Sequence, residues 1–336
     1  MLRAVPTRPA LPGDCPRRGG VRSYSEAGPC VLARKSVSAS PQSARSVVRC
    51  RLGWSAVSAE MSPFSGDLRR DLLPLRGRVA LVTGASRRGG IGCAVARRLG
   101  AYGASVYVHH HVPHDRAMPW GADSIEAVVG SVREALGEPG ARVVAGAGDL
   151  ADPAEPGRLI DAVVGEFGRL DILVANHALS GSGGTLDEID AEMLDAHWAV
   201  DTRSVLLLVQ AYARSRARLP EGIPGGRVVL MTSGQDLGGG MPGEIAYALQ
   251  KGALASVTRS LAGALAGRGI TVNAVNPGPV DTGYATGEVH AAVAARFPGG
   301  RWGLPDDPAR LIAWLATDEA RWITGEVINS EGGFRR

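Results

Sequence analysis

The sequence predicts an α/β fold, in which a parallel sheet carries helices on both of its faces. From residue 78 onward, short β-rich runs alternate with longer stretches of helical character. The short runs are continuously apolar, which is typical of strands buried on both faces. The first run leads through a glycine-rich turn directly into an apolar helix. This alternation favours parallel strands joined by helical crossovers, with ligands bound beyond the carboxyl ends of the strands.

Each expected strand is a short β-rich run, and each expected helix fills a longer interval between runs. The strands are expected at residues 79–83, 105–109, 142–145, 172–175, 227–231, 271–275 and 326–328. The helices are expected at about 91–102, 122–136, 155–167, 188–218, 245–267 and 306–316. We expect all of them to form one domain over residues 71–336, after an N-terminal extension of residues 1–70.

The N-terminal extension differs from the rest of the chain in charge and composition. Residues 1–60 contain ten basic and three acidic residues, whereas the remainder contains 27 basic and 30 acidic residues. The extension is rich in Arg, Ser, Pro and Gly without a sustained apolar period, so we expect it to be disordered. Because the excess positive charge lies there, the folded part has no charge pattern that indicates nucleic-acid binding. Nucleic-acid binding through the extension is an alternative that requires the extension to be part of the translated protein.

The origin of the extension has two interpretations. Its Arg-rich, acid-poor composition resembles an organelle transit peptide. Against that, the whole chain has 35 Arg, two Lys and 46 Gly, which indicates a biased base composition, and Met61 stands shortly before the first strand. Our hypothesis is that the natural start is Met61 or a nearby residue.

Cysteine usage and hydropathy favour a cytoplasmic protein. Three of the four cysteines lie in the extension, Cys93 lies in the expected domain, and no CxxC or Cys/His zinc spacing occurs. The reducing cytoplasm is the default compartment for such a chain. No apolar run approaches the roughly 18–20 residues of a membrane span. We therefore expect a soluble protein without a disulfide framework or a cysteine-based metal site.

Lysine is almost absent from the expected domain, and its one occurrence is informative. Residues 61–336 contain Lys251 and 26 arginines, and Lys251 follows Tyr247 by four positions. On a helix these two side chains share one face. A nearby ammonium favours the phenolate and lowers the pKa of a tyrosine, so Tyr247 is a candidate general acid and base. The alternative interpretation of this spacing is a half-exposed packing pair.

The glycine-rich turn after the first strand is a candidate phosphate site. Residues 83–92 read Thr-Gly-Ala-Ser-Arg-Arg-Gly-Gly-Ile-Gly. Glycines let the backbone approach a pyrophosphate, which the free N–H groups at the start of the next helix stabilise. The candidate residues are Gly84, Ser86, Arg87, Arg88, Gly90, Ile91 and Gly92.

With these motifs and a serine shortly before Tyr247, the chain resembles the short-chain dehydrogenase/reductase family over about residues 76–333. The resemblance extends to Leu-Val-Ala-Asn-His-Ala at 173–178, Asn-Pro-Gly-Pro-Val-Asp-Thr at 276–282, and the segments 301–306 and 324–333. It implies a single-domain Rossmann-type, doubly wound parallel sheet and nicotinamide-dependent oxidoreduction of an alcohol or a carbonyl. The motifs are similar to those of 3-oxoacyl-carrier-protein reductases, and they imply a homo-oligomer, either a tetramer or a dimer.

By position, the resemblance implies four catalytic residues. Tyr247 would be the acid/base, Lys251 would hold the nicotinamide ribose and lower the pKa of Tyr247, and Ser233 would hydrogen-bond the reacting oxygen. Ser233 precedes Tyr247 by fourteen residues instead of the usual thirteen, so Thr232 is a second candidate by its chemistry. Asp201 stands where the family usually has an Asn that helps to hold a proton path. An Asp that caps or solvates a helix turn is equally compatible with this position.

The implied cofactor is NADP(H), with NAD(H) as the alternative. NAD sites usually have an acid at the end of the second strand for the ribose 2′-hydroxyl, but this strand ends in three histidines, among them His110. Arg87 and Arg88 lie in a turn two residues longer than the family's, and they can neutralise a 2′-phosphate. Consecutive strand residues point to alternate faces, so we expect no metal site at the histidines. The other cofactor contacts implied by position are Asp149, Leu150, Asn176, Pro277, Gly278, Val280 and Thr282, besides Tyr247 and Lys251.

Substrate specificity in this family tends to lie in segments that correspond to residues 283–298, 179–184 and 238–243. These segments are rich in Ala and Gly, and residues 283–295 contain no Arg or Lys that could bind an anionic substrate. We expect a small or medium neutral carbonyl or alcohol. The alternative is a catalytically impaired regulatory or scaffold protein that kept the nucleotide-binding fold, for which Asp201 and the displaced Ser233 are the only support.

Overall fold

The predicted parallel sheet is present in the computed structural model, which describes residues 70–181, 183–220, 222–235 and 237–336. The predicted disorder of the extension lies outside the described residues, except for residue 70. Seven parallel strands follow the order β3-β2-β1-β4-β5-β6-β7. The strands are β1 Val79–Val82, β2 Ser105–His110, β3 Val143–Ala147, β4 Ile172–Ala175, β5 Gly226–Met231, β6 Ile270–Asn276 and β7 Val327–Asn329. The predicted strand positions are therefore confirmed to within about two residues.

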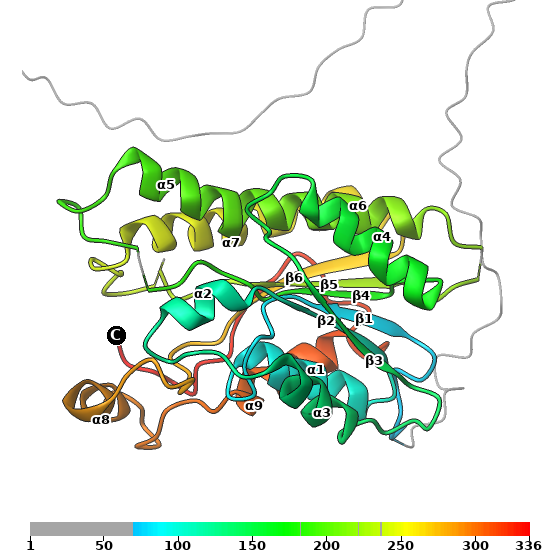
Figure 1. Ribbon diagram of the computed structural model, residues 1–336, viewed down its shortest axis with the longest axis horizontal. Coiled ribbons are helices and arrows are strands. Elements are labelled where there is room, and N and C mark those ends of the chain that lie inside the picture. The colour runs from blue at the N-terminus through cyan, green and yellow to red at the C-terminus, as the bar shows by residue number, and fades with distance from the viewer. Residues whose placement is uncertain (1–69, 182, 221, 236) are drawn as a thin grey trace, which may run out of the picture. The chain divides into compact units, whose positions relative to one another are not determined.

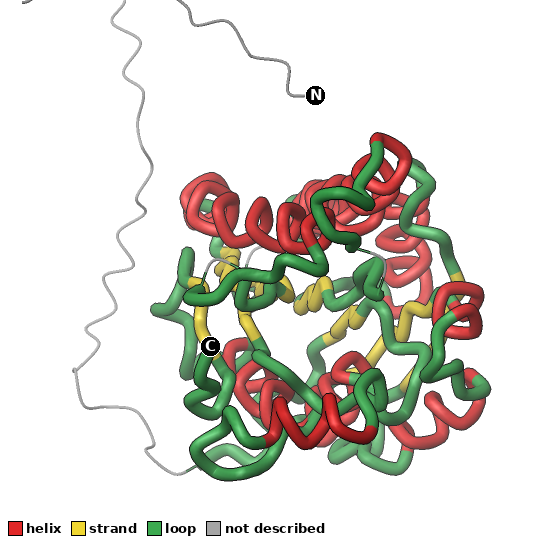
Figure 2. Tube along the Cα trace, turned by 90° about the vertical axis from the view of Figure 1, so that its left-hand side faces the viewer, coloured by secondary structure: helices red, strands yellow, loops and turns green. Residues whose placement is uncertain are grey.

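Helices cover both faces of this sheet, as Figure 1 shows and as the side view in Figure 2 repeats. One layer contains α1, α3 and α9, and the other contains α4, α6 and α7. The helical elements are α1 Ile91–Ala101, α2 Val112–Ala117, α3 Ile125–Arg133, α4 Glu155–Phe167, α5 Ala191–His197, a π-helical turn η1 Trp198–Arg203, α6 Ser204–Arg216, α7 Ile245–Ala266, α8 Gly287–Ala294 and α9 Asp306–Leu315.

Alternate residues of each strand fill two separate cores. In β1, Ala80 and Val82 pack with α1 and α9 residues such as Leu99, whereas Leu81 packs on the opposite face with residues such as Leu208. Successive strand side chains point to opposite faces, so a strand in a doubly covered sheet must be apolar at every position. This requirement explains the continuous apolar runs of the sequence.

Two helices and one helix interruption differ from the sequence prediction. The predicted helix 188–218 begins at Ala191 and is interrupted by the π-helical turn η1. The helices α2 and α8 were not expected, because they have six and eight residues and bury none of them, so no apolar period marks them. Across the described ranges, no helix combines the length and the apolar character that a membrane span requires.

The strand order places a ligand crevice at a defined point of the sheet. β1 lies between β2 and β4, so the chain winds outward in both directions from β1. At such a switch point the loops after neighbouring strands separate and leave a crevice at the carboxyl ends of the strands.

Candidate active site

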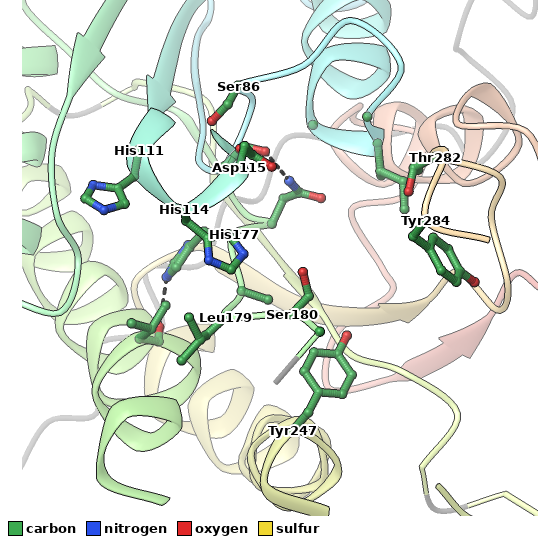
Figure 3. Close-up of a pocket in the computed structure, with 18 of the residues that line it drawn as sticks. Ser86, His111, His114, Asp115, His177, Leu179, Ser180, Tyr247, Thr282 and Tyr284 are labelled. Atoms are coloured by element: carbon green, nitrogen blue, oxygen red, sulfur yellow. Dashed lines mark hydrogen bonds between the residues drawn. The ribbon is translucent and has the colours of Figure 1, made fainter. Parts of the chain in front are cut away.

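A cavity of about 750 Å³ lies at the carboxyl ends of the strands. Its walls come from the segments after β1, β2, β3, β4, β5 and β6 and from the first turn of α7. Figure 3 shows Ser86 of the glycine-rich turn at one end of the cavity and the Tyr247 ring at the other. The cavity therefore connects the candidate phosphate site with the candidate acid/base.

Two glycines of the turn pack too closely against neighbouring atoms to carry a side chain. Gly84 has a φ of 66°, and a Cβ there would lie 2.6 Å from the His177 Cα. A Cβ on Gly92 would lie 2.7 Å from the Gly84 carbonyl oxygen and 2.8 Å from the Asn176 Nδ2. That Nδ2 donates to the carbonyl oxygens of Thr83 and Gly84, both at 3.0 Å. The turn is thus held rigidly in a shape that fits a pyrophosphate at the start of α1.

The two arginines of the turn have different surroundings. Arg87 lines the cavity; its Nη1 donates to the Thr282 carbonyl oxygen at 2.7 Å, and its Nε lies 3.3 Å from Asp115 Oδ1. The Arg87 guanidinium also lies over the Trp120 ring, 5.3 Å from the centroid. Arg88 is 59% exposed and pairs with Asp123. The structure therefore brings Arg87 to the cavity but leaves Arg88 outside its wall.

The end of β2 also differs from the sequence interpretation. His111 lines the cavity, whereas His110 does not. An acid, Asp115, does reach this region from α2, although no acid follows β2 directly. Asp115 is engaged by Arg87 and by the Trp120 indole Nε1, which donates to it at 3.0 Å. Asp115 was not predicted, because α2 is too short to show a helical period.

Two buried histidines brace the glycine-rich turn. Gly84 N donates to the His109 Nδ1 at 3.4 Å, and the His109 Nε2 lies 3.1 Å from the Gly148 carbonyl oxygen. The His177 Nδ1 lies 2.7 Å from Thr83 Oγ1, and its Nε2 lies 2.8 Å from Ser204 Oγ. Burial lowers the pKa of His109 to about 4 and holds that of His177 well below its ordinary value. Both rings are neutral and therefore serve as donor and acceptor at once.

Tyr247 and Lys251 lie together on α7, as their spacing predicts. The Lys251 Nζ lies 5.5 Å from the centroid of the Tyr247 ring and donates to the Met231 carbonyl oxygen at 2.9 Å. Lys251 is only 2% exposed. Ser233 lines the cavity together with Tyr247, in spite of the extra residue between them, and its Oγ donates to the Met241 Sδ at 3.7 Å. Thr232 also lines the cavity, and its buried Oγ1 has no partner in the described part of the chain.

The expected effect of Lys251 on Tyr247 is contradicted. Burial raises the pKa of Tyr247, and the carboxylates of Asp201 and Glu244 raise it further, while Ser233 acts in the opposite direction. Desolvation of a phenolate outweighs its other interactions here. Burial also lowers the pKa of Lys251, and Asp201 counteracts this. Tyr247 is therefore a protonated phenol at neutral pH, which suits a proton donor.

Asp201 is not a solvated helix residue, so this alternative is wrong. It is 0% exposed in the turn η1. Its Oδ1 accepts a hydrogen bond from Leu179 N at 2.6 Å, and its Oδ2 lies 2.8 Å from the His197 Nδ1. Asp201 and Lys251 lie behind the cavity wall and support residues that form it.

Most of the other predicted residues do line the cavity. These are Gly84, Ser86, Gly90, Ile91, Gly92, Asp149, Leu150, Asn176, Pro277, Gly278, Val280 and Thr282. The three predicted specificity segments contribute Leu179, Ser180, Gly181, Met241 and Tyr284. Sequence reasoning missed Glu244, which lines the cavity three residues before Tyr247 and accepts a hydrogen bond from Gly183 N at 3.0 Å. The sequence signal that could have identified Glu244 is its position three residues before Tyr247, directly before α7.

The low pKa of His109 predicts a loss of stability in acid. Below pH 6.5 the unfolded chain takes up a proton that the folded protein refuses until about pH 4. The free energy of unfolding should therefore fall between pH 6.5 and pH 4, by up to about 3 kcal/mol from this group. We expect urea unfolding of His109→Gln, compared with wild type at pH 7, 5.5 and 4.5, to depend less on pH. Equal pH dependence of the two proteins would contradict this assignment.

Comparisons with known proteins agree with this geometry. The family model described as enoyl-(acyl carrier protein) reductase matches residues 84–335. The uncharacterized oxidoreductase YjdA of Bacillus subtilis is 42% identical over 259 residues, which cover 77% of this chain and 97% of that protein. Versicolorin reductase 1 of Aspergillus parasiticus is 34% identical over 278 residues, which cover 78% of this chain and 98% of that protein.

Solved structures of other proteins are also similar to this chain. A short chain dehydrogenase from Burkholderia cenocepacia in complex with NADP is 37% identical, with a TM-score of 0.67, and the match covers 77% of this chain and 98% of that chain. A mutant short-chain dehydrogenase/reductase from Serratia marcescens is 35% identical, with a TM-score of 0.67, and the match covers 78% of this chain and 100% of that chain. The chain therefore belongs to the short-chain dehydrogenase/reductase family of NAD(P)-dependent oxidoreductases.

Proposed function

We propose that this protein is an NADP(H)-dependent reductase of a small or medium neutral carbonyl compound, with Tyr247 as the proton donor. One observation carries the proposal: Ser233 and Tyr247 line the same cavity as a glycine-rich turn in which Gly84 and Gly92 leave no space for a Cβ. Versicolorin reductase 1, a relative of this chain, is by its name a reductase. The alternative of an impaired scaffold protein loses support, because Ser233 lines the cavity with Tyr247 and Asp201 has partners for both oxygens.

The residues at the turn fit a nicotinamide dinucleotide. The cradle of Gly84 and Gly92 would receive the pyrophosphate, and Asp149 with Leu150 would border the adenine. NADP(H) is favoured because Arg87 and His111 line the cavity near the end of β2, where Asp115 is already engaged. The short chain dehydrogenase from Burkholderia cenocepacia was solved with NADP. The bound cofactor would supply the hydride for the carbonyl carbon.

Tyr247 and its neighbours would handle the proton at the carbonyl oxygen. Ser233 would hold that oxygen, and the Tyr247 hydroxyl would donate its proton as the C=O bond becomes a C–OH bond. The phenol is protonated at neutral pH, so it can donate a proton to the carbonyl oxygen. Lys251 lies behind the cavity wall, donates one N–H to Met231, and would support Tyr247 from there.

The Tyr247 hydroxyl gives the direct test of this function. Tyr247→Phe should lower kcat for NADPH-dependent reduction of a neutral ketone by at least about a hundredfold, because only the proton donor is removed. NADPH binding, measured by nucleotide fluorescence, should change by less than threefold. A panel of ketones and alcohols with NADPH and NADP⁺ first identifies a substrate for wild type. A Tyr247→Phe variant with most of the wild-type rate would assign the proton to another group.

The two turn arginines form a matched pair for the cofactor preference. A charge-assisted contact between Arg87 and the 2′-phosphate would contribute about 1.5–3 kcal/mol. Arg87→Ala should therefore weaken NADPH binding by at least tenfold and NADH binding much less. Arg88→Ala is the control and should change neither by more than twofold, because its side chain pairs with Asp123 away from the cavity. Tighter binding of NADH than NADPH by wild type would refute the preference itself.

Glu244 makes the substrate end of the cavity unfavourable for anions. Its carboxylate lines the wall near Tyr247, and Arg87, the one guanidinium in the described wall, is paired with Asp115. Two like charges about 8 Å apart repel by about 2 kcal/mol at an effective dielectric constant of about 20. Wild type should therefore reduce 4-methylacetophenone with a kcat/KM at least about tenfold above that for 4-acetylbenzoate.

Removal of the Glu244 charge should narrow the difference in kcat/KM between the neutral and the anionic ketone. Glu244→Gln keeps an oxygen for Gly183 N and should bring the two kcat/KM values to within about threefold of each other. Glu192→Gln, at an exposed position of α5, is the control and should preserve the wild-type ratio. An unchanged ratio in Glu244→Gln would show that shape and not charge decides between these ketones.

A further inference from the structure

The π-helical turn η1 brings two ionisable side chains together in the interior of the protein. His197 is the last residue of α5, and Asp201 follows it by four positions inside η1. Both side chains are 0% exposed. Single π-helical turns within longer helices occur frequently at functional sites. The sequence predicts one uninterrupted helix here, so the turn is a specific departure from regular structure.

The two carboxylate oxygens of Asp201 have different donors. Oδ1 accepts the Leu179 N–H at 2.6 Å, and Oδ2 accepts the His197 Nδ1–H at 2.8 Å. An ionised carboxylate can only accept hydrogen bonds, and a buried one without a donor is costly. An Asn at this position would present an amide nitrogen to one of these two donors. His197 and the carboxylate of Asp201 are therefore chemically matched to each other.

The Asp201 carboxylate acts on the catalytic side chains through its charge and through η1. Its charge favours the ammonium of Lys251 and disfavours the phenolate of Tyr247. The residue after it, Thr202, donates to Gln250 Oε1 at 2.8 Å and so ties η1 to α7 beside Lys251. Leu179, whose backbone N–H donates to the Asp201 Oδ1, lies in the cavity wall. The ionisable groups around this centre are Tyr247, Lys251 and Glu244 of α7, His114 of α2 and His177 after β4.

We propose that His197 is a positioning residue for the reaction, which holds Asp201 as a carboxylate so that Lys251 remains an ammonium beside Tyr247. The inference rests on the proposed function only for its effect on turnover. Without the His197 donor, the buried Asp201 would take up a proton, because the neutral acid is easier to bury than an unpaired carboxylate. Lys251 would then lose its compensating charge and would release its proton at a lower pH.

The single lysine of the domain permits a direct measurement that does not require turnover. The full chain labelled with ¹³C-lysine contains only Lys35 and Lys251, and a Lys35→Arg variant assigns the two signals. We expect the Lys251 Cε signal of His197→Leu to titrate at least one pH unit below that of wild type. His197→Asn, which keeps an N–H donor close to the position of Nδ1, should restore most of the wild-type titration.

The kinetic readout separates charge from packing. With a neutral ketone and NADPH, His197→Leu should lose at least tenfold in kcat/KM at pH 7, and the alkaline limb of its pH profile should move to lower pH. His197→Asn should recover most of this loss. In an Asp201→Asn background the carboxylate is already absent, so adding His197→Leu should cost less than a further threefold. Thermal unfolding identifies any variant that fails to fold, in which case the Asn variants decide.

Two results would overturn the inference. One is a Lys251 titration that is the same in wild type and in folded His197→Leu. The other is an equal loss of kcat/KM in His197→Leu and His197→Asn that persists undiminished in the Asp201→Asn background, which would indicate packing alone. A wild-type protein that reduces no ketone with NADPH would instead refute the proposed function, and the lysine titration would still decide the role of His197.

Discussion

The burial of one ammonium group is the constraint on which the candidate site depends. Lys251 is 2% exposed, and a buried charge is tolerated only with hydrogen-bond acceptors and a compensating charge. Its acceptor is the Met231 carbonyl at the end of β5, and the compensating charge comes from Asp201 in η1. The end of a central strand, the first turns of α7 and the interruption of the helix before α6 therefore meet at one group. Tyr247 occupies the cavity side of this arrangement.

The charged side chains of the glycine-rich turn are paired with carboxylates of the protein. Asp115 is shared by Arg87 and Trp120, and Arg88 is held by Asp123. The two histidines at the turn are kept neutral by burial. The turn is consequently shaped by neutral donors and acceptors, and its selectivity for a 2′-phosphate depends on how far Arg87 can leave Asp115. This balance distinguishes the site from one with free basic residues.

The sequence predicted the features that arise from local periodicity and from short motifs. Continuous apolar runs identified the strands, and the i, i+4 spacing placed Tyr247 and Lys251 on one face. Features that depend on tertiary contacts were not predictable. The helix α2 has no buried residue, so no apolar periodicity marked the segment that contains Asp115 and is followed by Trp120. The turn η1 lies within a stretch whose sequence is typical of a regular helix. The role of Asp201 depends on its hydrogen bonds with Leu179 and His197, which only the structure shows.

The raised pKa of Tyr247 could not be predicted from the sequence motif alone. The motif supplies a nearby ammonium, but desolvation depends on everything that packs around the phenol, and here it raises the pKa. A protonated Tyr247 beside a buried Lys251 is the physical basis of the proposed reductase activity. The central claim is that this arrangement requires the compact ammonium of lysine and not positive charge in general.

The most direct measurement is NADPH-dependent reduction of a neutral ketone by Lys251→Arg, compared with wild type at equal NADPH saturation and with folding checked by circular dichroism. The account predicts a loss of at least about a hundredfold in kcat, since the planar guanidinium cannot occupy the buried site beside Met231 in the same way. A folded Lys251→Arg variant with a rate within a few fold of wild type would contradict the account.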